Sequence, residues 1–426
     1  MTATMTVMAF GMLFLGVPLW LIFLATATVL IFFFFPHLPM NAVVTTLFGT
    51  LDNFVLLAVP GFIFAGEVMG RGGMTDRMIR WARALVGPVP GGMPISSLGA
   101  ITLFSAISGS STACTAAMGK ILYPALRQSR YSEKFSLGLL TATGGIDVVI
   151  PPSITMVLYS AVTNASLGKL FLAGFVPGLL LGLIIGAYSL YVSYKEGIVG
   201  GERWNGKEIW DSTKDVLFTI GAPVLVFGGI YGGWFTPTEA AGVACIYCVF
   251  VSVYVYRELT WKGVWEIALE AAQLTSKVLL ISASAGLFTY VLTIAKIPPA
   301  LASSIAGMDL APWSVLLMIN LVLLIAGMFL DPTSIVLALT PILWPIANAV
   351  GIDVVHFGII YTVNIAIGMF TPPFGLNLFV ATSIFKVPIS RLVPAVLPFL
   401  GCYLLGLALI TYLPWISTWL PNLVGP

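Results

Sequence analysis

Two stretches of this sequence, GGIDVVIPPS at residues 144–153 and GMFTPPFGLN at residues 368–377, each place two adjacent prolines inside a long apolar segment. Proline has no backbone N–H, and its ring clashes with the carbonyl group four residues earlier in an α-helix. A helix is therefore predicted to break at each pair. The carbonyl groups expected to lose their helical partners are those of Asp147, Val148, Gly368 and Met369. Unpaired carbonyls are costly in hydrocarbon, so such breaks indicate contact with protein or a water-filled cavity. A kinked helix without a ligand is the alternative.

The composition around these breaks is that of a membrane protein. Of the 426 residues, 59% are hydrophobic and 8% are charged, whereas a soluble domain has about 25% charged residues. In water, so much apolar surface would cause aggregation. The 19 Lys and Arg residues nearly balance the 17 Asp and Glu residues, so the net charge gives no indication of a nucleic-acid partner, and none is expected.

The apolar segments predict several membrane spans, since about 20 apolar residues cross a bilayer as a helix. The spans are expected near residues 5–35, 41–70, 134–163, 168–194, 217–234, 238–256, 277–295, 354–385 and 392–420. Two further stretches, 93–127 and 312–348, are interrupted by small polar residues and are too short to cross twice. We expect both to be helical hairpins that enter the membrane and return to the same side.

One constant shift in residue number aligns the two halves of the chain. It carries Ser110 onto Asp331 at the hairpin tips and the first proline pair onto the second. Clusters of Arg and Lys place the first hairpin on the cytoplasmic side and the second outside, so the halves are expected to be inverted. Inverted repeats with broken helices near the membrane midplane are a recurring plan of secondary transporters. The predicted fold is therefore an all-α polytopic membrane protein with inverted repeats, two re-entrant helical hairpins and two broken helices.

The hairpin tips carry the polar groups of these apolar segments. In SGSST at residues 108–112 one helix is expected to end and another to begin, offering carbonyls to a cation and free N–H groups to an anion. Packing of small residues between helices is the alternative. Asp331 at the second tip is a candidate cation ligand, because intramembrane carboxylates are often functional; capping of the next helix is compatible with that role. Asp147, Asp52 and Glu67 are further carboxylates in or near apolar segments.

At these motifs the chain resembles the large membrane subunit of the tripartite ATP-independent periplasmic (TRAP) transporters. The resemblance extends over essentially the whole chain, and the motifs that carry it are FSAISGSSTA at 104–113, GIDVVIPPS at 145–153, GMFLDPT at 327–333 and GMFTPPFGLN at 368–377. It implies an elevator mechanism with Na⁺ as the coupling ion and no other cofactor. It also implies that the protein lies in the bacterial cell inner membrane. The implied partners are a small membrane subunit of about four helices and a periplasmic solute-binding protein, and the implied substrate is a small organic anion, mostly a carboxylate.

The resemblance assigns roles to particular residues by position. One Na⁺ site is expected at Ser110, Gly145, Val148 and Pro151. A second Na⁺ site is expected at Asp331, Thr333, Gly368, Met369 and Thr371. The expected substrate-binding residues are Ser108, Ser111, Ser153 and Asn377.

The same resemblance divides the chain into six segments. In order, these are scaffold helices at 1–92, a hairpin and broken helix of the transport domain at 93–164, a span and cytoplasmic connector at 165–216, scaffold helices at 217–311, a second hairpin and broken helix at 312–386, and a C-terminal span at 387–426. The alternative hypothesis is a standalone Na⁺–organic-anion symporter that needs no binding protein. An enzyme is not expected, because the only histidines, His37 and His356, lie at predicted external ends of spans, away from the serines.

Overall fold

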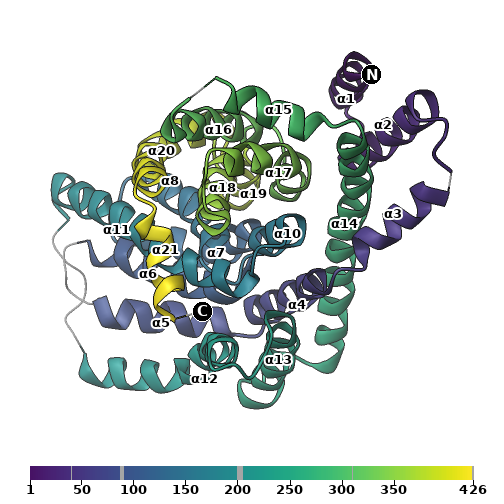
Figure 1. The fold of residues 1–426 in the computed structure, drawn as a ribbon. Coiled ribbons are helices and arrows are strands. Elements are labelled where there is room, and N and C mark those ends of the chain that lie inside the picture. The colour runs from purple at the N-terminus through teal and green to yellow at the C-terminus, as the bar shows by residue number, and fades with distance from the viewer. Residues whose placement is uncertain (40, 87–90, 199–204, 309, 425–426) are drawn as a thin grey trace.

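The computed structural model describes the chain except for residues 40, 87–90, 199–204, 309 and 425–426 (Figure 1). All regular structure in the described part is helical. Eight of its helices are long and apolar enough to cross a membrane. The all-α character expected from the composition is therefore confirmed.

The first half of the chain runs from α1 to α11. Its elements are α1 (Thr2–Phe14), α2 (Leu19–Phe34), α3 (Asn41–Leu51), the 3₁₀ helix η1 (Phe54–Leu57), α4 (Ala58–Arg71), α5 (Met74–Val86), α6 (Gly92–Ser108), α7 (Ser111–Gln128), α8 (Glu133–Thr143), α9 (Ile146–Val149), α10 (Ile154–Thr163) and α11 (Leu167–Lys195).

The second half runs from α12 to α21. Its elements are α12 (Gly206–Tyr231), α13 (Pro237–Phe250), the π-helix η2 (Val251–Val255), α14 (Trp261–Ile294), α15 (Ile297–Ala306), α16 (Pro312–Gly327), α17 (Pro332–Ala349), α18 (Val354–Gly368), α19 (Leu376–Phe385), α20 (Ile389–Tyr412) and α21 (Trp415–Val424).

The single span predicted at residues 5–35 is wrong, because this apolar run forms two helices. α1 ends at Phe14 and α2 begins at Leu19. Between them Gly16 adopts a left-handed φ of +73°, and Pro18 directly precedes α2. A glycine in this conformation ends one helix, and the fixed φ of proline suits the start of the next.

The span predicted at residues 41–70 is interrupted as well. α3 ends at Leu51, and the side chain of Asn53 accepts a hydrogen bond from the N–H of Val55 at 3.0 Å, which starts η1. α4 follows directly from Ala58. An asparagine that caps a helix in this way ends the preceding helix, which hydropathy alone does not detect.

Two other predicted spans have different limits. The one expected at 277–295 is the second part of α14, a helix of 34 residues that begins at Trp261. Glu266 and Glu270 in its first half are exposed, so their charges do not end the helix. The last predicted span ends at Tyr412, and α21 follows it as a separate helix.

Two helix pairs fold back on themselves. α6 packs against α7, and the tip between them is Gly109 and Ser110; α16 packs against α17 across residues 328–331. Gly109 has a φ of +59°, which is unfavourable for a residue with a side chain. Asp331 and Pro332 start α17 as its N-cap and first helical residue.

Both helix breaks predicted from the proline pairs are present. α8 ends at Thr143, a single turn forms α9, and residues 150–153 are non-helical before α10 begins. α18 ends at Gly368, and residues 369–375 separate it from α19. The peptide bond within each proline pair is cis.

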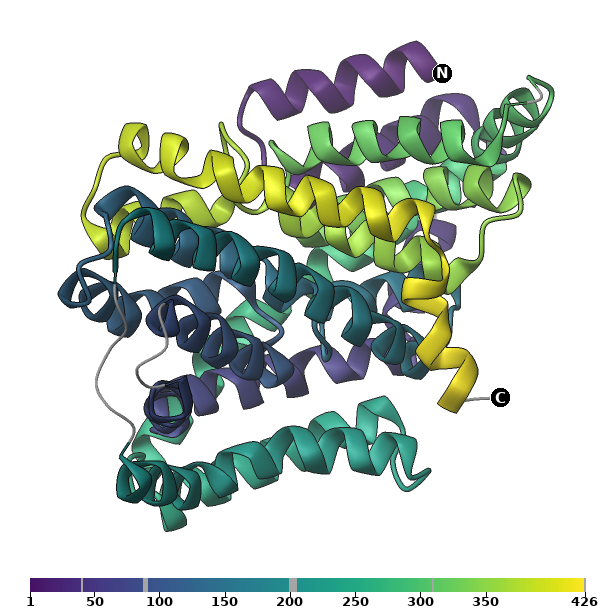
Figure 2. The same ribbon diagram turned by 90° about the vertical axis from the view of Figure 1, so that its left-hand side faces the viewer.

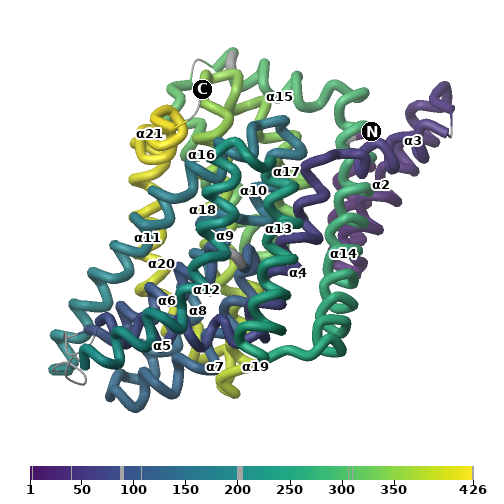
Figure 3. The backbone as a smooth tube through the Cα atoms, turned by 90° about the horizontal axis from the view of Figure 1, so that it is seen from below, coloured from purple at the N-terminus to yellow at the C-terminus, as the bar shows by residue number. Residues whose placement is uncertain are grey.

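The helix pairs and the broken helices occupy the middle of the molecule. Figure 1 shows α14 along one side, where it packs against α2, α3, α4 and α17, and α11 on the opposite side, where it packs against α20 and α21. α12 and α13 form a further layer, packed against α5 and α4 respectively (Figure 2). In the view of Figure 3, α9 and α18 lie between α11 and α14. Residues 150–153 of the first break are buried, whereas Pro373 and Phe374 of the second break are exposed.

Candidate functional site

The tip of the first hairpin touches the first helix break through backbone atoms. A Cβ built on Gly109 would lie 2.9 Å from the carbonyl oxygen of Pro152, so glycine is required for this approach. On the other side of the tip, a Cβ on Gly66 of α4 would lie 2.8 Å from the carbonyl oxygen of Ser108. These contacts hold the hydroxyl groups of residues 108–112 beside the break.

The first hairpin is also joined to the second broken helix. The Ser111 hydroxyl donates to the carbonyl of Gly144 at 2.7 Å. The Asn377 amide donates through Nδ2 to Ser111 Oγ at 2.8 Å and to the carbonyl of Thr141 at 3.4 Å. Residues 266 positions apart in the sequence thus meet at one point. We call Ser111, Gly144 and Asn377 the junction.

The junction contains polar atoms without partners. Asn377 Oδ1 and the hydroxyl of Thr115 are buried, and neither has a hydrogen-bond partner in the described part of the chain. A Cβ on Gly144 would come within 2.0 Å of Thr115 Oγ1 and 3.1 Å of Asn377 Nδ2, so Thr115 lies directly beside the junction. Buried polar atoms are almost always paired. These two atoms therefore point to a water, ion or substrate group at the junction.

The four residues predicted to bind substrate are partly brought together. Ser111 and Asn377 are in direct contact at the junction. Ser108, at the hairpin tip, accepts a hydrogen bond from the N–H of Ser110 at 3.4 Å. Ser153 is fully buried next to the proline pair, and its hydroxyl has no partner among the described residues.

Two helices begin at the junction, and a third begins beside the Gly109 tip. α7 begins at Ser111, α10 begins directly after Ser153, and Asn377 lies in the first turn of α19. The hairpin tip also lies close to the start of α10. A Cβ built on Gly109 would lie 3.7 Å from the backbone nitrogen of Ile154. Helix N-termini carry free N–H groups and a partial positive charge, which favour anions.

The first predicted cation site offers oxygen atoms. Ser110 precedes α7, and its Oγ lies 3.4 Å from Thr112 Oγ1. The carbonyl of Gly145 accepts the N–H of Val148 at 3.2 Å. The carbonyls of Asp147 and Val148 face prolines four positions later, and no turn or loop hydrogen bond among the described residues reaches them. Hydroxyl and carbonyl oxygens of this kind suit a hard cation.

The prediction of free carbonyls at the second break is wrong. The carbonyl of Gly368 accepts the N–H of Thr371 at 3.2 Å, and that of Met369 accepts the N–H of Asn377 at 2.8 Å. The chain reverses tightly after α18 and so supplies donors that a straight helix would not. Gly375 permits this turn, since a Cβ there would lie 2.8 Å from the carbonyl oxygen of Met369. Each carbonyl keeps a second lone pair.

The second predicted cation site lies at the start of α17. Asp331 caps this helix: its carboxylate accepts the N–H of Ser334 at 3.1 Å and also the Ser334 hydroxyl. Thr333 is half-buried beside it. Thr371 at the break donates its hydroxyl proton to the carbonyl of Ile367 at 2.6 Å.

The second hairpin and the second break touch through glycine backbones. A Cβ on Gly368 would lie 2.6 Å from the Cα of Gly327, the last residue of α16. The capping of α17 by Asp331, described above, is confirmed. The role of Asp331 as a cation ligand stays a prediction.

A chain of hydrogen-bonded polar side chains inside the helices was not predicted from the sequence. Asn364 donates to Asn320 Oδ1 at 2.8 Å, and Asn320 donates to Thr411 Oγ1 at 3.1 Å. The two asparagines stand in otherwise apolar helices, a signal that would have identified them. His356 was expected at an external end of a span; it is buried, with Nδ1 2.6 Å from Ser417 Oγ.

Two of the carboxylates singled out from the sequence have ordinary surroundings. Asp52 is exposed. Glu67 forms an ion pair with Arg71 at 3.6 Å, and Arg71 also pairs with Glu270. Solvent exposure accounts for Asp52, and the ion pair with Arg71 accounts for Glu67, without a ligand.

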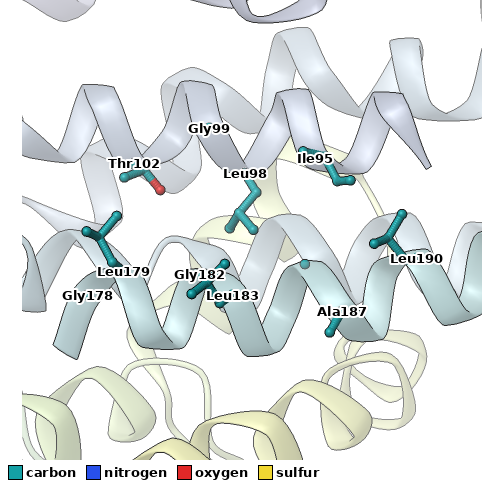
Figure 4. Close-up of a pocket in the computed structure, with 11 residues that line it drawn as sticks. Ile95, Leu98, Gly99, Thr102, Gly178, Leu179, Gly182, Leu183, Ala187 and Leu190 are labelled. Atoms are coloured by element: carbon teal, nitrogen blue, oxygen red, sulfur yellow. The ribbon is translucent and has the colours of Figure 1, made fainter. Parts of the chain in front are cut away.

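A groove of about 450 Å³ lies between α6 and α11 (Figure 4). Leucine side chains and glycine backbone dominate its walls, and Thr102 is the one hydroxyl residue among those that line it. A carboxylate would find no charge and almost no hydrogen-bond donors there. None of the junction residues lines this groove, so the two are separate sites.

The overall arrangement has a counterpart among solved transporters. The YdaH transporter of Alcanivorax borkumensis superposes with a TM-score of 0.57 at 15% sequence identity, over 91% of this chain and 90% of that one. At this level of identity the likeness concerns the fold alone.

Similarity in sequence is much closer to a group of bacterial permeases. The C4-dicarboxylate TRAP transporter large permease protein DctM of Pseudomonas aeruginosa is 43% identical over 379 residues, or 89% of each chain. The sialic acid TRAP transporter large permease protein SiaM of Vibrio cholerae is 36% identical over 97% of this chain and 96% of its own. Residues 6–416 match the family described as the DctM component of the tripartite ATP-independent periplasmic transporters. The chain, a multi-pass membrane protein by its apolar helices, belongs to this family of TRAP transporter large permeases.

Proposed function

We propose that this chain carries out Na⁺-coupled uptake of a small organic anion, most simply a carboxylate, that a periplasmic solute-binding protein delivers. The site works in the bacterial inner membrane beside a small membrane subunit. The observation that carries the proposal is the junction, where Ser111 of the first half meets Asn377 of the second.

The junction suits an anion because donors and helix N-termini converge on it. α7 begins at the junction and α10 begins beside the adjoining hairpin tip, and their first N–H groups offer a carboxylate neutral hydrogen-bond donors together with positive dipole ends. α19 adds the positive end of its dipole, although the N–H of Asn377 already donates to the carbonyl of Met369. Ser108 and Ser153 add hydroxyl groups at its edge. Relatives named for C4-dicarboxylates and for sialic acid support a carboxylate substrate.

The coupling ion occupies the two predicted oxygen sites that flank the junction. Ser110, Gly145, Val148 and Pro151 supply hydroxyl and carbonyl oxygens at the first break. Asp331 and Thr333 with Gly368, Met369 and Thr371 supply oxygens at the second, including one carboxylate. Such donor sets fit a small hard cation, by analogy with Ca²⁺ and Mg²⁺ sites. Binding of Na⁺ at both breaks stabilises the helix ends that hold the substrate.

Transport follows an elevator mechanism. Each hairpin enters the membrane and returns to the same side, and the hairpins and broken helices move as one transport domain. They are tied together by the Ser111–Asn377 hydrogen bond and by the contact of Gly327 with Gly368. The scaffold comprises the helices at 1–92 and 217–311, among which α4 packs on α13 and α14.

Transport in proteoliposomes tests this proposal. The chain is reconstituted with and without a small subunit and a binding protein from the same source, and uptake of labelled C4-dicarboxylate or sialic acid is measured. Uptake is expected only with both partners and an inward Na⁺ gradient. Uptake that is equally fast with choline in place of Na⁺ would refute coupling. Uptake by the chain alone would favour a standalone symporter.

A matched pair of variants localises the substrate site. Ser111→Ala removes the hydrogen bonds to Gly144 and Asn377, and we expect at least about tenfold slower uptake, the effect of losing 1.4 kcal/mol or more of buried hydrogen bonding. Ser97→Ala removes only a bond to the carbonyl of Met93 within α6, and uptake should stay near normal. Equal uptake by the two variants would place the substrate elsewhere.

A further inference from the structure

Asp147 is the one fully buried Asp or Glu among the described residues. It lies on α9, within the first helix break, with an exposed fraction of 0%. Neither carboxyl oxygen has a hydrogen-bond partner, and no Lys, Arg or His in the described chain pairs with it. An unpaired charge in such a place is strongly destabilising. The carboxyl group is therefore either neutral or beside a cation.

The two hydroxyl groups near Asp147 donate their protons elsewhere. Ser105 of α6 and Cys114 of α7 lie next to the carboxyl group, and Tyr403 of α20 lies near Cys114. The Ser105 hydroxyl donates to the carbonyl of Ile101 at 2.8 Å, and the Tyr403 hydroxyl donates to that of Ala142 at 2.8 Å. Each hydroxyl has a single proton, which is already used. A negative charge at Asp147 needs a mobile cation.

The proposed cation sites are unequal in charge if Asp147 is left out. At the second break, Asp331 supplies a carboxylate. At the first, Ser110, Gly145, Val148 and Pro151 supply only uncharged oxygens. Asp147 lies in the single turn of α9, two residues after Gly145, which precedes that turn, and directly before Val148. Each half of the chain would then contribute one carboxylate to one cation.

We infer that Asp147 supplies the negative charge of the first cation site and binds the coupling Na⁺ electrostatically, from within the broken helix. This rests on the proposed Na⁺ coupling. The bound ion in turn removes the cost of the buried carboxylate, so Asp147 and Na⁺ stabilise each other.

The substitution Asp147→Asn distinguishes a neutral carboxyl group from an ionised one beside Na⁺. An amide has the shape of a protonated acid and can donate to Ser105 Oγ as that acid would. If Asp147 is neutral, the variant therefore resembles the wild type. If Asp147 is ionised beside Na⁺, the variant loses the charge that holds the ion.

Na⁺-dependent thermal stability of the purified full-length chain in nanodiscs provides the readout, which needs neither substrate nor partner proteins. NaCl is titrated against choline chloride at constant ionic strength. The wild type should show saturable stabilisation by Na⁺. In Asp147→Asn we expect one of the two Na⁺-dependent components to weaken at least about tenfold, since a unit charge within roughly 8 Å of an ion has an effect of this order in a protein interior.

Three comparisons make the result decisive. Asp215→Asn makes the same chemical change at a carboxylate already paired with Arg80 at 2.9 Å, and should titrate like the wild type. Asp147→Ser, a smaller neutral variant, should show the same loss as Asp147→Asn and serves if the latter does not fold. A wild-type Na⁺ titration in either folded variant would overturn the inference. A wild type that does not respond to Na⁺ would instead refute Na⁺ coupling itself, and the inference with it.

Discussion

Substitution of Gly368 by alanine should separate the second hairpin from the second helix break. The new Cβ would lie 2.6 Å from the Cα of Gly327, 2.8 Å from its carbonyl oxygen and 2.9 Å from its carbonyl carbon. All three atoms belong to the backbone, so no change of rotamer relieves the contact. α16 or α18 has to shift, and the shift reaches the carbonyls of residues 368 and 369 at the proposed cation site.

The size of this effect follows from two opposing contributions. Overpacking costs roughly 1–3 kcal/mol, and a contact between two backbones lies at the upper end of that range. Alanine in place of a helical glycine stabilises by roughly 0.5–1 kcal/mol. The net loss for Gly368→Ala is therefore about 2 kcal/mol, a factor of about 30 in the folding equilibrium.

Gly401→Ala on α20 is the matched control. A Cβ on Gly401 has no atom within 4 Å, so this variant should gain roughly 0.5–1 kcal/mol from the same change of residue. Chemical unfolding in one detergent gives both differences, and proteoliposome uptake gives the functional consequence. If Gly368→Ala is as stable as Gly401→Ala and transports normally, the backbone contact does not hold the two elements together.

Two further substitutions distinguish ion binding from structural support. Asp331→Asn should keep its stability within about 0.5 kcal/mol, because asparagine caps helices as well as aspartate, while the Na⁺ concentration for half-maximal uptake should rise; unchanged Na⁺ dependence would exclude Asp331 as a ligand. Arg80→Gln removes ion pairs to Glu208 at 2.8 Å and Asp215 at 2.9 Å, yet these side chains are exposed and the loss should stay below about 1 kcal/mol and disappear in high salt. A larger, salt-independent loss of unfolding free energy would mean that this contact between α5 and α12 is structurally essential.

Local chemistry was sufficient to predict the helix breaks. The proline pairs break α8–α10 and α18–α19 where expected, because a missing N–H acts within four residues of the chain. The hairpin tip at Gly109 and the cap at Asp331 are equally local. In each case the determining interaction lies within one helical turn, so a single sequence contains it.

Features that depend on the path of the chain in space were not predictable in this way. The carbonyls of Gly368 and Met369 were expected to be free, but the tight turn at Gly375 returns donors to them. The pairing of Ser111 with Asn377 involves two polar residues in separate motifs, and nothing in either motif specifies the other. Asp147 was one of several carboxylates in the sequence, and only its complete burial distinguishes it.

The pairing of Ser111 with Asn377 also has a consequence for biosynthesis. During translation, the first half enters the membrane before the Asn377 amide, which donates to Ser111 Oγ, has been synthesised 266 residues further along the chain. Until α19 has been synthesised, the junction lacks Asn377, and the proposed substrate site is incomplete. The proposed substrate site is therefore complete only near the end of synthesis, and truncation before α19 is expected to abolish binding there even if every earlier helix is inserted correctly.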